Sequence, residues 1–317
     1  MALVLVIVGG VGLLQVIFII TTIQRACPGL RDYYAVQQVI RIIQVSPIVL
    51  MTASAIWFFF LVFLSIKFEH PYRTKEGLLH VALACYLWIN VTFNYLAAML
   101  TSPGHPITSQ EMQEEGLACE NNCILCLKCD RIKSPEEHHC STCGNCITMM
   151  CHHCPFTNNC VGLENYSYFF LFVCYCVVGL LFSMYMTYEP FYHCMVYNGE
   201  HLSLLPWYPP GVCQKLGDYA VIFIPVAFMA MFSTAMFCMQ SLLLLSDCST
   251  IDLMTSIQRS KNYTRLARNL LKRIVARKKR RFHIMFLHSR HHWWQFFIPS
   301  FNVHPRHMQT VRLIHVQ

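Results

Sequence analysis

The stretch CLKCDRIKSPEEHHCSTCGNCITMMCHHCPFTNNC, from Cys126 to Cys160, decides how the polar part of this chain folds. Structural zinc takes four thiolate or imidazole ligands in a closed tetrahedral arrangement. Two C-x2-C pairs, each joined by a later His and a later Cys, therefore predict two interleaved zinc sites. The first comprises Cys126, Cys129, His139 and Cys146, and the second comprises Cys140, Cys143, His153 and Cys160. A rival register that pairs Cys123 with Cys126 remains open. Bound metal supplies folding energy that so small an apolar core cannot.

The rest of the chain is strongly apolar. Of its 317 residues, 55% are hydrophobic and 13% are charged, which is too apolar for an ordinary soluble domain. A helix needs about 20 consecutive apolar residues to cross a bilayer core. Five stretches approach that length, at roughly 2–23, 46–66, 78–100, 167–187 and 219–245. We expect an all-α integral membrane protein with a four-helix transmembrane core and one extra N-terminal span.

Charge predicts the orientation of these spans. The tail at 246–317 carries 14 of the 24 Lys and Arg residues but only two acids, and positive charge near span ends marks the cytoplasmic side. Because the last two spans form one hairpin, the cysteine-rich insert lies on the same side as the tail. Clustered cysteines in a reducing compartment indicate metal binding or catalysis rather than disulfides. The first segment lacks the basic start of a signal peptide, so we expect an extra span; an incorrect start of the gene model is the alternative.

These predictions divide the chain into five parts. They are an extra span with a cytosolic linker (1–45), a transmembrane hairpin (46–100), a cytosolic two-zinc domain (101–166), a second transmembrane hairpin (167–245) and a basic cytosolic tail (246–317).

Four side chains are left over once eight ligands are assigned: His138, Cys151, His152 and Cys154. Cys154 follows two His residues and lies close to the point where the chain re-enters the membrane. A thiolate is a nucleophile, an adjacent imidazole can take its proton, and neighbouring zinc sites hold the loop still. This arrangement suits the transfer of an acyl chain that lies in the membrane.

The stretch from Cys126 to Asn165 resembles the cysteine-rich domain of the DHHC protein S-acyltransferases (palmitoyltransferases). The pattern of that family runs C-x2-C, H-C-x2-C-x2-C-x4-D-H-H-C-P-W, then N-C-V-G and N. This chain keeps every Cys and His at the expected spacing, together with Pro155, Asn159, Cys160, Val161, Gly162 and Asn165. Weaker resemblances are TSPG at Thr101–Gly104, to the D-P-G element of the family, and STID at Ser249–Asp252, to its T-T-x-E motif.

The resemblance implies an enzyme with two structural Zn²⁺ ions on the eight residues above. Cys154 would take a long-chain acyl group, such as palmitoyl, from acyl-coenzyme A and pass it to a cysteine of a substrate protein. His152 would act as general base. The implied partners are the lipid bilayer, acyl-coenzyme A and cysteine-containing substrate proteins, and the implied location is the Golgi or endoplasmic reticulum membrane with the active domain in the cytosol.

One departure weakens this interpretation. The Asp of D-H-H-C is Cys151 here, and in a nucleophile–base–orienter arrangement the carboxylate fixes the imidazole tautomer. Cys151 could supply a weak acceptor as its thiolate, compete as a second nucleophile, or do nothing. The alternative function is therefore a catalytically weakened or silent zinc-bearing membrane adaptor.

Two smaller features are open to more than one interpretation. The stretch Lys261–Arg281 has the pattern of a basic amphipathic helix, which suits either anionic lipid or a solvated tail. Nucleic acid is not expected, because no reading motif accompanies the charge. Gly179 lies in the middle of the fourth span, where a large side chain would shorten an acyl cavity, although a packing role is the simpler interpretation.

Overall fold

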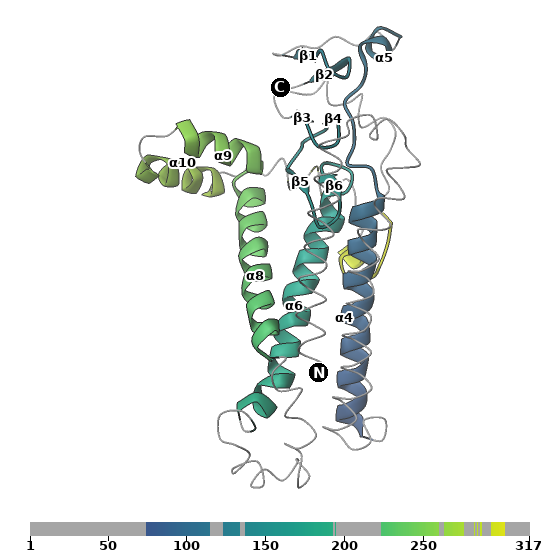
Figure 1. Cartoon of the computed structure of the whole chain (residues 1–317), viewed down its shortest axis with the longest axis vertical. Coiled ribbons are helices and arrows are strands. Elements are labelled where there is room, and N and C mark those ends of the chain that lie inside the picture. The colour runs from purple at the N-terminus through teal and green to yellow at the C-terminus, as the bar shows by residue number, and fades with distance from the viewer. Residues whose placement is uncertain are drawn as a thin grey trace. The chain divides into compact units, whose positions relative to one another are not determined.

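A computed structural model describes residues 74–114, 123–133, 137–192, 194, 223–259, 263–275, 282, 284, 286 and 293–301 (Figure 1). The predicted spans at 2–23 and 46–66 lie outside these residues. The described chain falls into two compact units, one with residues 74–92, 173–192 and 223–237, the other with residues 93–172 and 238–301.

Among the residues that the structure describes, three helices are long and apolar enough to cross a membrane: α4 (Lys75–Leu100), α6 (Tyr166–Phe191) and α8 (Phe223–Leu245). They coincide with the predicted segments at 78–100, 167–187 and 219–245, which are confirmed as helices. The sequence of α8 contains no charged side chain. Thr74 caps the start of α4, since its Oγ1 accepts a hydrogen bond from the Gly77 N–H at 3.1 Å.

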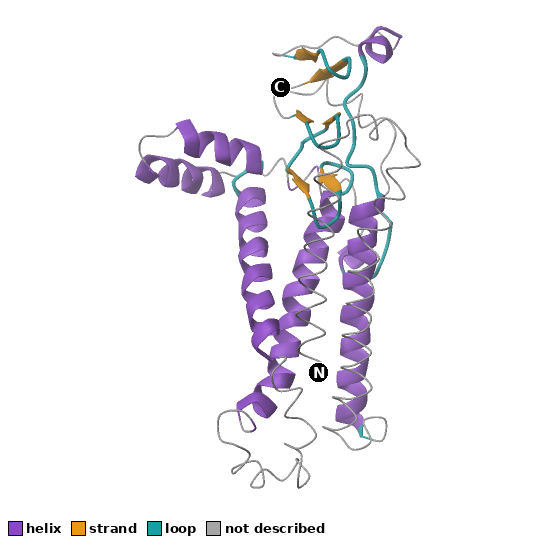
Figure 2. Cartoon of the chain, viewed as in Figure 1, coloured by secondary structure: helices purple, strands orange, loops and turns teal. Residues whose placement is uncertain are grey.

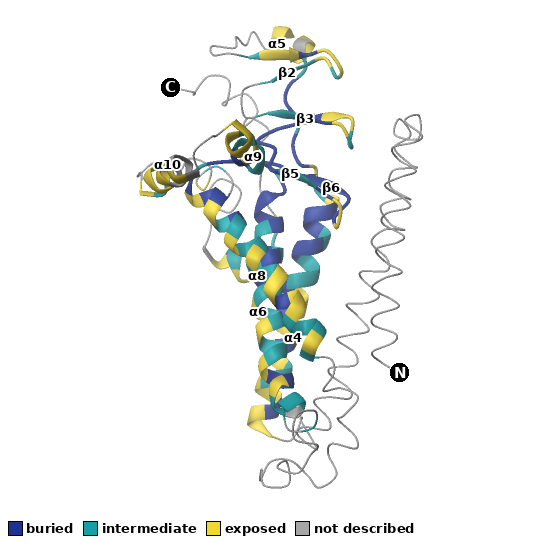
Figure 3. Cartoon of the chain, turned by 60° about the vertical axis from the view of Figure 1, so that its left-hand side comes forward, coloured by how far each residue is buried: buried dark blue, intermediate teal, exposed yellow. Residues whose placement is uncertain are grey.

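In the first unit, aromatic side chains join the helices. The hydroxyls of Tyr86 on α4 and Tyr175 on α6 lie 3.1 Å apart, and the rings of Phe191 and Phe223 stack with centroids 4.7 Å apart. Large apolar side chains elsewhere on these helices are exposed, and exposed residues, drawn in yellow, recur along the helices in Figure 3. Such a surface fits a hydrocarbon surrounding, where apolar side chains need no protein partner.

The second unit contains all the described strands, which form three short antiparallel hairpins (Figure 2). They are β1 (Ile124–Cys126) with β2 (Arg131–Lys133), β3 (His138–Cys140) with β4 (Asn145–Ile147), and β5 (His152–Cys154) with β6 (Asn159–Val161). The pairing register repeats in all three, as Cys126↔Arg131, Cys140↔Asn145 and Cys154↔Asn159. Each turn also contains a residue with positive φ, at Asp130, Gly144 and Asn158. The hairpins are thus three copies of one structure at an interval of 14 residues.

Two buried amides attach the third hairpin to the end of α4. A helix leaves its last four carbonyls without helical partners. The Nδ2 of Asn159 donates to the Met99 carbonyl at 3.1 Å and the Thr101 carbonyl at 2.9 Å, while the Nδ2 of Asn165 donates to the Ala98 carbonyl at 3.1 Å. These contacts explain why both amides are fully or almost fully buried.

The loop after α4 packs tightly against the same hairpin. A Cβ at Gly162 would lie 2.4 Å from the Pro103 carbonyl oxygen, so only glycine allows this approach. Ser102 stabilises the turn at Ser102–Gly104, because its Oγ accepts a hydrogen bond from the Gly104 N–H at 3.1 Å. An Asp at this position, as in D-P-G, could accept the same hydrogen bond.

Short helices complete the second unit: α5 (Ser109–Glu114), α9 (Thr250–Arg259), α10 (Tyr263–Val275) and the 3₁₀ helix η6 (Trp293–Phe296). STID forms the start of α9. The Ser249 Oγ accepts from the Asp252 N–H at 3.0 Å, and the Asp252 carboxylate accepts from the Ser249 N–H at 2.9 Å. This reciprocal pair is a capping box.

Candidate active site and metal centres

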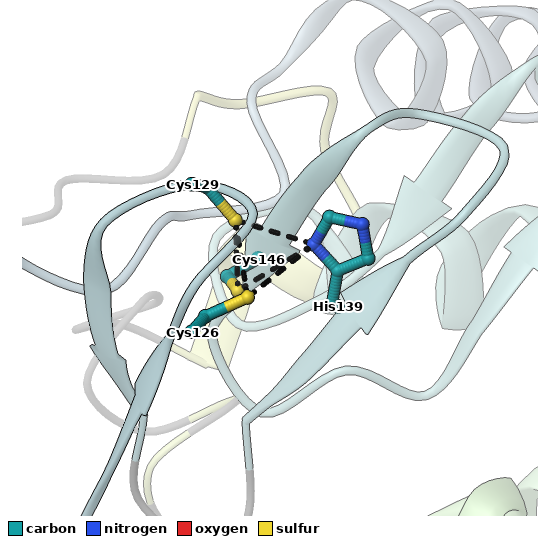
Figure 4. Close-up of side chains that lie close together, drawn as sticks. All are labelled: Cys126, Cys129, His139 and Cys146. Atoms are coloured by element: carbon teal, nitrogen blue, oxygen red, sulfur yellow. Dashed lines mark hydrogen bonds between the residues drawn. The ribbon is translucent and has the colours of Figure 1, made fainter.

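The first two hairpins bring four predicted ligands together (Figure 4). The Cys129 Sγ lies 3.5 Å from the Cys126 Sγ, 3.3 Å from the Cys146 Sγ and 3.2 Å from the His139 Nδ1. Zinc–sulfur and zinc–nitrogen bonds of about 2.3 and 2.1 Å at tetrahedral angles put neighbouring ligand atoms roughly 3.5–3.8 Å apart. The group therefore has nearly the size of a zinc shell.

The second group repeats the first one hairpin later. The Cys143 Sγ lies 3.4 Å from the Cys160 Sγ and 3.3 Å from the His153 Nδ1, and the Cys140 Sγ lies 3.8 Å from the same nitrogen. All four atoms fall within 4.8 Å of one another. These two groups contain the eight residues predicted from the sequence.

The chemistry of these side chains fits zinc. A thiolate is the metal-binding form of cysteine. A backbone N–H of Lys128, with help from neighbouring thiols, lowers the pKa of Cys126 to about 7, whereas burial raises the pKa of Cys146 in the same group. Cys123 lies outside both groups, so the rival register that pairs it with Cys126 is not formed. Each group could hold one zinc ion, with three sulfurs and one imidazole nitrogen as donors.

The third hairpin has no such group. Cys154 occupies the position that Cys126 and Cys140 occupy in the first two hairpins, but Thr157 stands where those hairpins have Cys129 and Cys143. The Thr157 Oγ1 donates to the Cys154 carbonyl oxygen at 3.4 Å. Cys154 therefore has the backbone setting of a zinc ligand without the second cysteine of the pair, and its side chain is only 4% exposed. Among the described residues it belongs to neither metal group.

His152 is the first residue of β5 and directly precedes His153, the histidine of the second group. Its ring meets the Phe169 ring edge-on at 5.1 Å between centroids. Burial, with a smaller effect of His153, lowers the pKa of His152 to about 4, which leaves the imidazole neutral and able to accept a proton at pH 7. Its Nδ1 is buried and has no hydrogen-bond partner. This is the nitrogen that an orienting carboxylate would hold.

The thiol of Cys151 has other partners. Its Sγ donates to the Gln240 Oε1 on α8 at 3.6 Å and lies 3.2 Å from the Thr250 Oγ1 at the start of α9. The Tyr166 hydroxyl donates to the same Gln240 oxygen at 3.4 Å. Cys151 and Gln240 are 2% and 3% exposed, so this is a buried network of neutral groups.

Sequence reasoning identified neither this network nor the 14-residue repeat. Gln240 gave a signal, since it is the one amide side chain in the apolar sequence of α8 and polar groups within spans need partners. Thr250 stood inside STID, but the sequence did not indicate that its hydroxyl meets residue 151.

The comparisons with known proteins match this site. Residues 120–261 match the DHHC palmitoyltransferase family. A protein of Dictyostelium discoideum named as a ZDHHC-type palmitoyltransferase is 30% identical over 161 residues, covering 44% of this chain and 43% of that protein. Palmitoyltransferase ZDHHC16 of Bos taurus is 31% identical over 162 residues, covering 50% of this chain and 41% of that protein. The chain thus matches less than half the length of these two relatives.

The helices and the site define a class of protein: a membrane protein with a cysteine- and histidine-rich domain in which two groups of residues could each hold a metal. Within that class, residues 120–261 form a domain that matches the DHHC palmitoyltransferase family, with Cys-His-His-Cys at 151–154 in place of Asp-His-His-Cys.

Proposed function

We propose that this chain is a protein S-acyltransferase that moves a long-chain acyl group, such as palmitoyl, from acyl-coenzyme A to cysteines of substrate proteins. Cys154 is the nucleophile and His152 is the general base. Two Zn²⁺ ions, held by the two groups of four residues, keep the hairpins rigid and take no part in the chemistry.

The reaction has two halves. In the first, the Cys154 sulfur attacks the thioester carbonyl carbon, the bond to the coenzyme A sulfur breaks, and the Cys154 proton passes through His152 to that leaving sulfur. In the second, a substrate thiol attacks the acyl-Cys154 thioester and gives its proton to His152. The Cys154 sulfur leaves, recovers that proton and is ready for the next turnover.

The observation that carries this proposal is the third hairpin. Its backbone register is that of the two metal-binding hairpins, yet Thr157 leaves Cys154 outside either metal group. A buried thiol two residues along β5 from a neutral imidazole, and twelve residues before α6 begins at Tyr166, suits an acyl chain that lies among membrane helices. Exclusion of water also protects a thioester intermediate from hydrolysis.

The proposed topology has a four-helix core, one extra N-terminal span, and the domains at 101–166 and 246–317 in the cytosol. Support comes from the positive charge of the tail and from the capping box of α9, which places Thr250 beside the loop of the insert. This contact supports the proposal that both parts lie on one side of the membrane. The Golgi or endoplasmic reticulum is the proposed location.

A thioester-trapping assay tests the function. Purified full-length protein is mixed with labelled palmitoyl-coenzyme A, and hydroxylamine-sensitive label is measured in the unmutated chain, Cys154→Ala and Cys151→Ala. We expect label in the unmutated chain and in Cys151→Ala, and none in Cys154→Ala. Cys151→Asp is expected to acylate faster, because a carboxylate at residue 151 offers an acceptor for the His152 Nδ1–H. Absence of label in an unmutated chain that contains two zinc ions would overturn the enzyme proposal.

A second function, a catalytically weakened or silent zinc-bearing membrane adaptor, is favoured by one observation. The buried Nδ1 of His152 has no hydrogen-bond partner, so nothing fixes the imidazole tautomer as an acidic partner would. In the assay above, this function predicts unlabelled protein that gains label with Cys151→Asp alone.

A further inference from the structure

The tail helix α10 presents an unusual surface. Its exposed side chains include Arg268, Leu271, Lys272 and Val275, which lie three or four residues apart and so share one helical face. Leu271 and Val275 are 60% and 82% exposed. The sequence between residues 263 and 281 holds nine Lys and Arg residues and no acid. A face that combines exposed cations with exposed aliphatic side chains is typical of a helix that lies in a membrane interface.

The structure holds α10 near the end of a membrane helix. The Arg273 Nη1 donates to the Cys248 Sγ at 2.7 Å, and Cys248 is the third residue after α8 ends at Leu245. Cys248 itself is buried. Between them, α9 runs from Thr250 to Arg259 and lies alongside α10 (Figures 1 and 3). The end of α8 is where that helix would leave the bilayer core, so α10 is tied to the level of the lipid headgroups.

We propose that α10 binds anionic phospholipid, with Arg268 and Lys272 at the headgroups and Leu271 and Val275 inserted among the upper acyl carbons. Charge complementarity selects this occupant, because the cytoplasmic leaflet is anionic and attracts basic segments next to a span. Five further cations at 277–281 add to that attraction. The aliphatic pair on the same face disfavours a purely ionic ligand, which would leave both side chains in water. This inference concerns the tail and does not depend on acyl transfer.

Hydrogen–deuterium exchange of residues 263–275 in the full-length chain tests the inference. The protein is placed in nanodiscs of phosphatidylcholine alone, and in nanodiscs in which a third of the lipid is phosphatidylserine. We expect slower exchange with phosphatidylserine. Each cation near an anionic surface contributes about fivefold to binding. The variant Arg268→Gln with Lys272→Gln should therefore bind phosphatidylserine roughly thirtyfold more weakly, and its α10 should lose that much of the slowing of exchange. The control Lys128→Gln with Lys133→Gln removes the same charge from the zinc domain and should change nothing in α10.

Further arms separate the possible sources of anion and test insertion. Leu271→Ser with Val275→Ser keeps every charge and should also weaken protection by phosphatidylserine; unchanged protection would overturn the inserted face. Equal exchange in the two nanodiscs would overturn anionic lipid as the occupant. If free coenzyme A protects α10 in phosphatidylcholine while phosphatidylserine does not, α10 binds a nucleotide phosphate and the lipid proposal is wrong.

Discussion

Replacing Asn165 with alanine should loosen the third hairpin from the membrane helices. Asn165 is fully buried at the start of α6. Its Oδ1 accepts from the Gly162 N–H at 2.9 Å, and its Nδ2 donates to the Cys160 carbonyl at 2.8 Å and to the Ala98 carbonyl at 3.1 Å. One side chain thus joins the last turn of α4 to β6, the strand that carries the candidate zinc ligand Cys160.

The structure sets the size of the effect. A typical intramolecular hydrogen bond contributes about 1 kcal/mol net, and a buried group left without a partner costs about 1–3 kcal/mol. The Ala98 carbonyl still accepts a hydrogen bond from the Asn159 Nδ2 at 3.3 Å. Losing the hydrogen bond from Asn165 to this carbonyl therefore costs less than losing the other two. Asn165→Ala should therefore destabilise the protein by about 3–5 kcal/mol. Asn165→Asp keeps the acceptor for Gly162 but turns a carboxylate toward two carbonyl oxygens, so we expect at least as large a loss.

The assay is thermal unfolding of the full-length protein in detergent, with zinc content measured before and after mild heating. The matched control is Asn145→Ala, which removes the same side chain from an exposed position in the second hairpin. Asn165→Ala should unfold at a lower temperature and lose zinc first from the second group, which contains Cys160. An Asn165→Asp variant as stable as the unmutated chain would refute the reasoning, since the two donated hydrogen bonds would then contribute nothing.

Three other measurements test the site. Thr157→Cys should give Cys154 a partner thiol at the spacing of the first two hairpins, and so reduce acyl-Cys154 formation in a way that reductant partly reverses. The control Thr157→Ser keeps the hydroxyl and should leave acyl-Cys154 formation unchanged. Full activity of Thr157→Cys would contradict the argument that the three hairpins repeat one structure. The low pKa of His152 predicts that its imidazole stays neutral as pH falls, so acylation in a pH series should show no loss assignable to His152 until about pH 4. An inflection near pH 6.5 in the acylation rate of the unmutated chain, at pH values where the protein stays folded, would contradict this. A Cβ at Gly179 would meet no atom within 4 Å, so Gly179→Phe should fold normally. Its large side chain should shorten the acyl cavity and shift the preference toward shorter acyl chains. An unchanged chain-length profile in a folded variant would show that Gly179 does not border the acyl chain.

The sequence by itself predicted the three described helices that are apolar enough to cross a membrane and the two groups of Cys and His residues that could hold a metal. Helices such as α8 follow from composition, because an uninterrupted apolar run has few stable alternatives to a buried or lipid-facing helix. The eight Cys and His residues follow from spacing, because zinc coordination is local and its ligands lie within 20 residues of one another in each group. Cys154 could be picked out by subtraction from that list.

Only the tertiary structure decided what surrounds Cys154. Thr157 leaves the third hairpin without a second cysteine, yet that position has meaning only once three hairpins are known to share one register. The partners of Cys151 are Gln240 and Thr250, 89 and 99 residues away, and no local pattern encodes contacts at such separation. Folding brings Gln240 of α8 and Thr250 of α9 to the Cys151 thiol, while the buried Nδ1 of His152 has no hydrogen-bond partner.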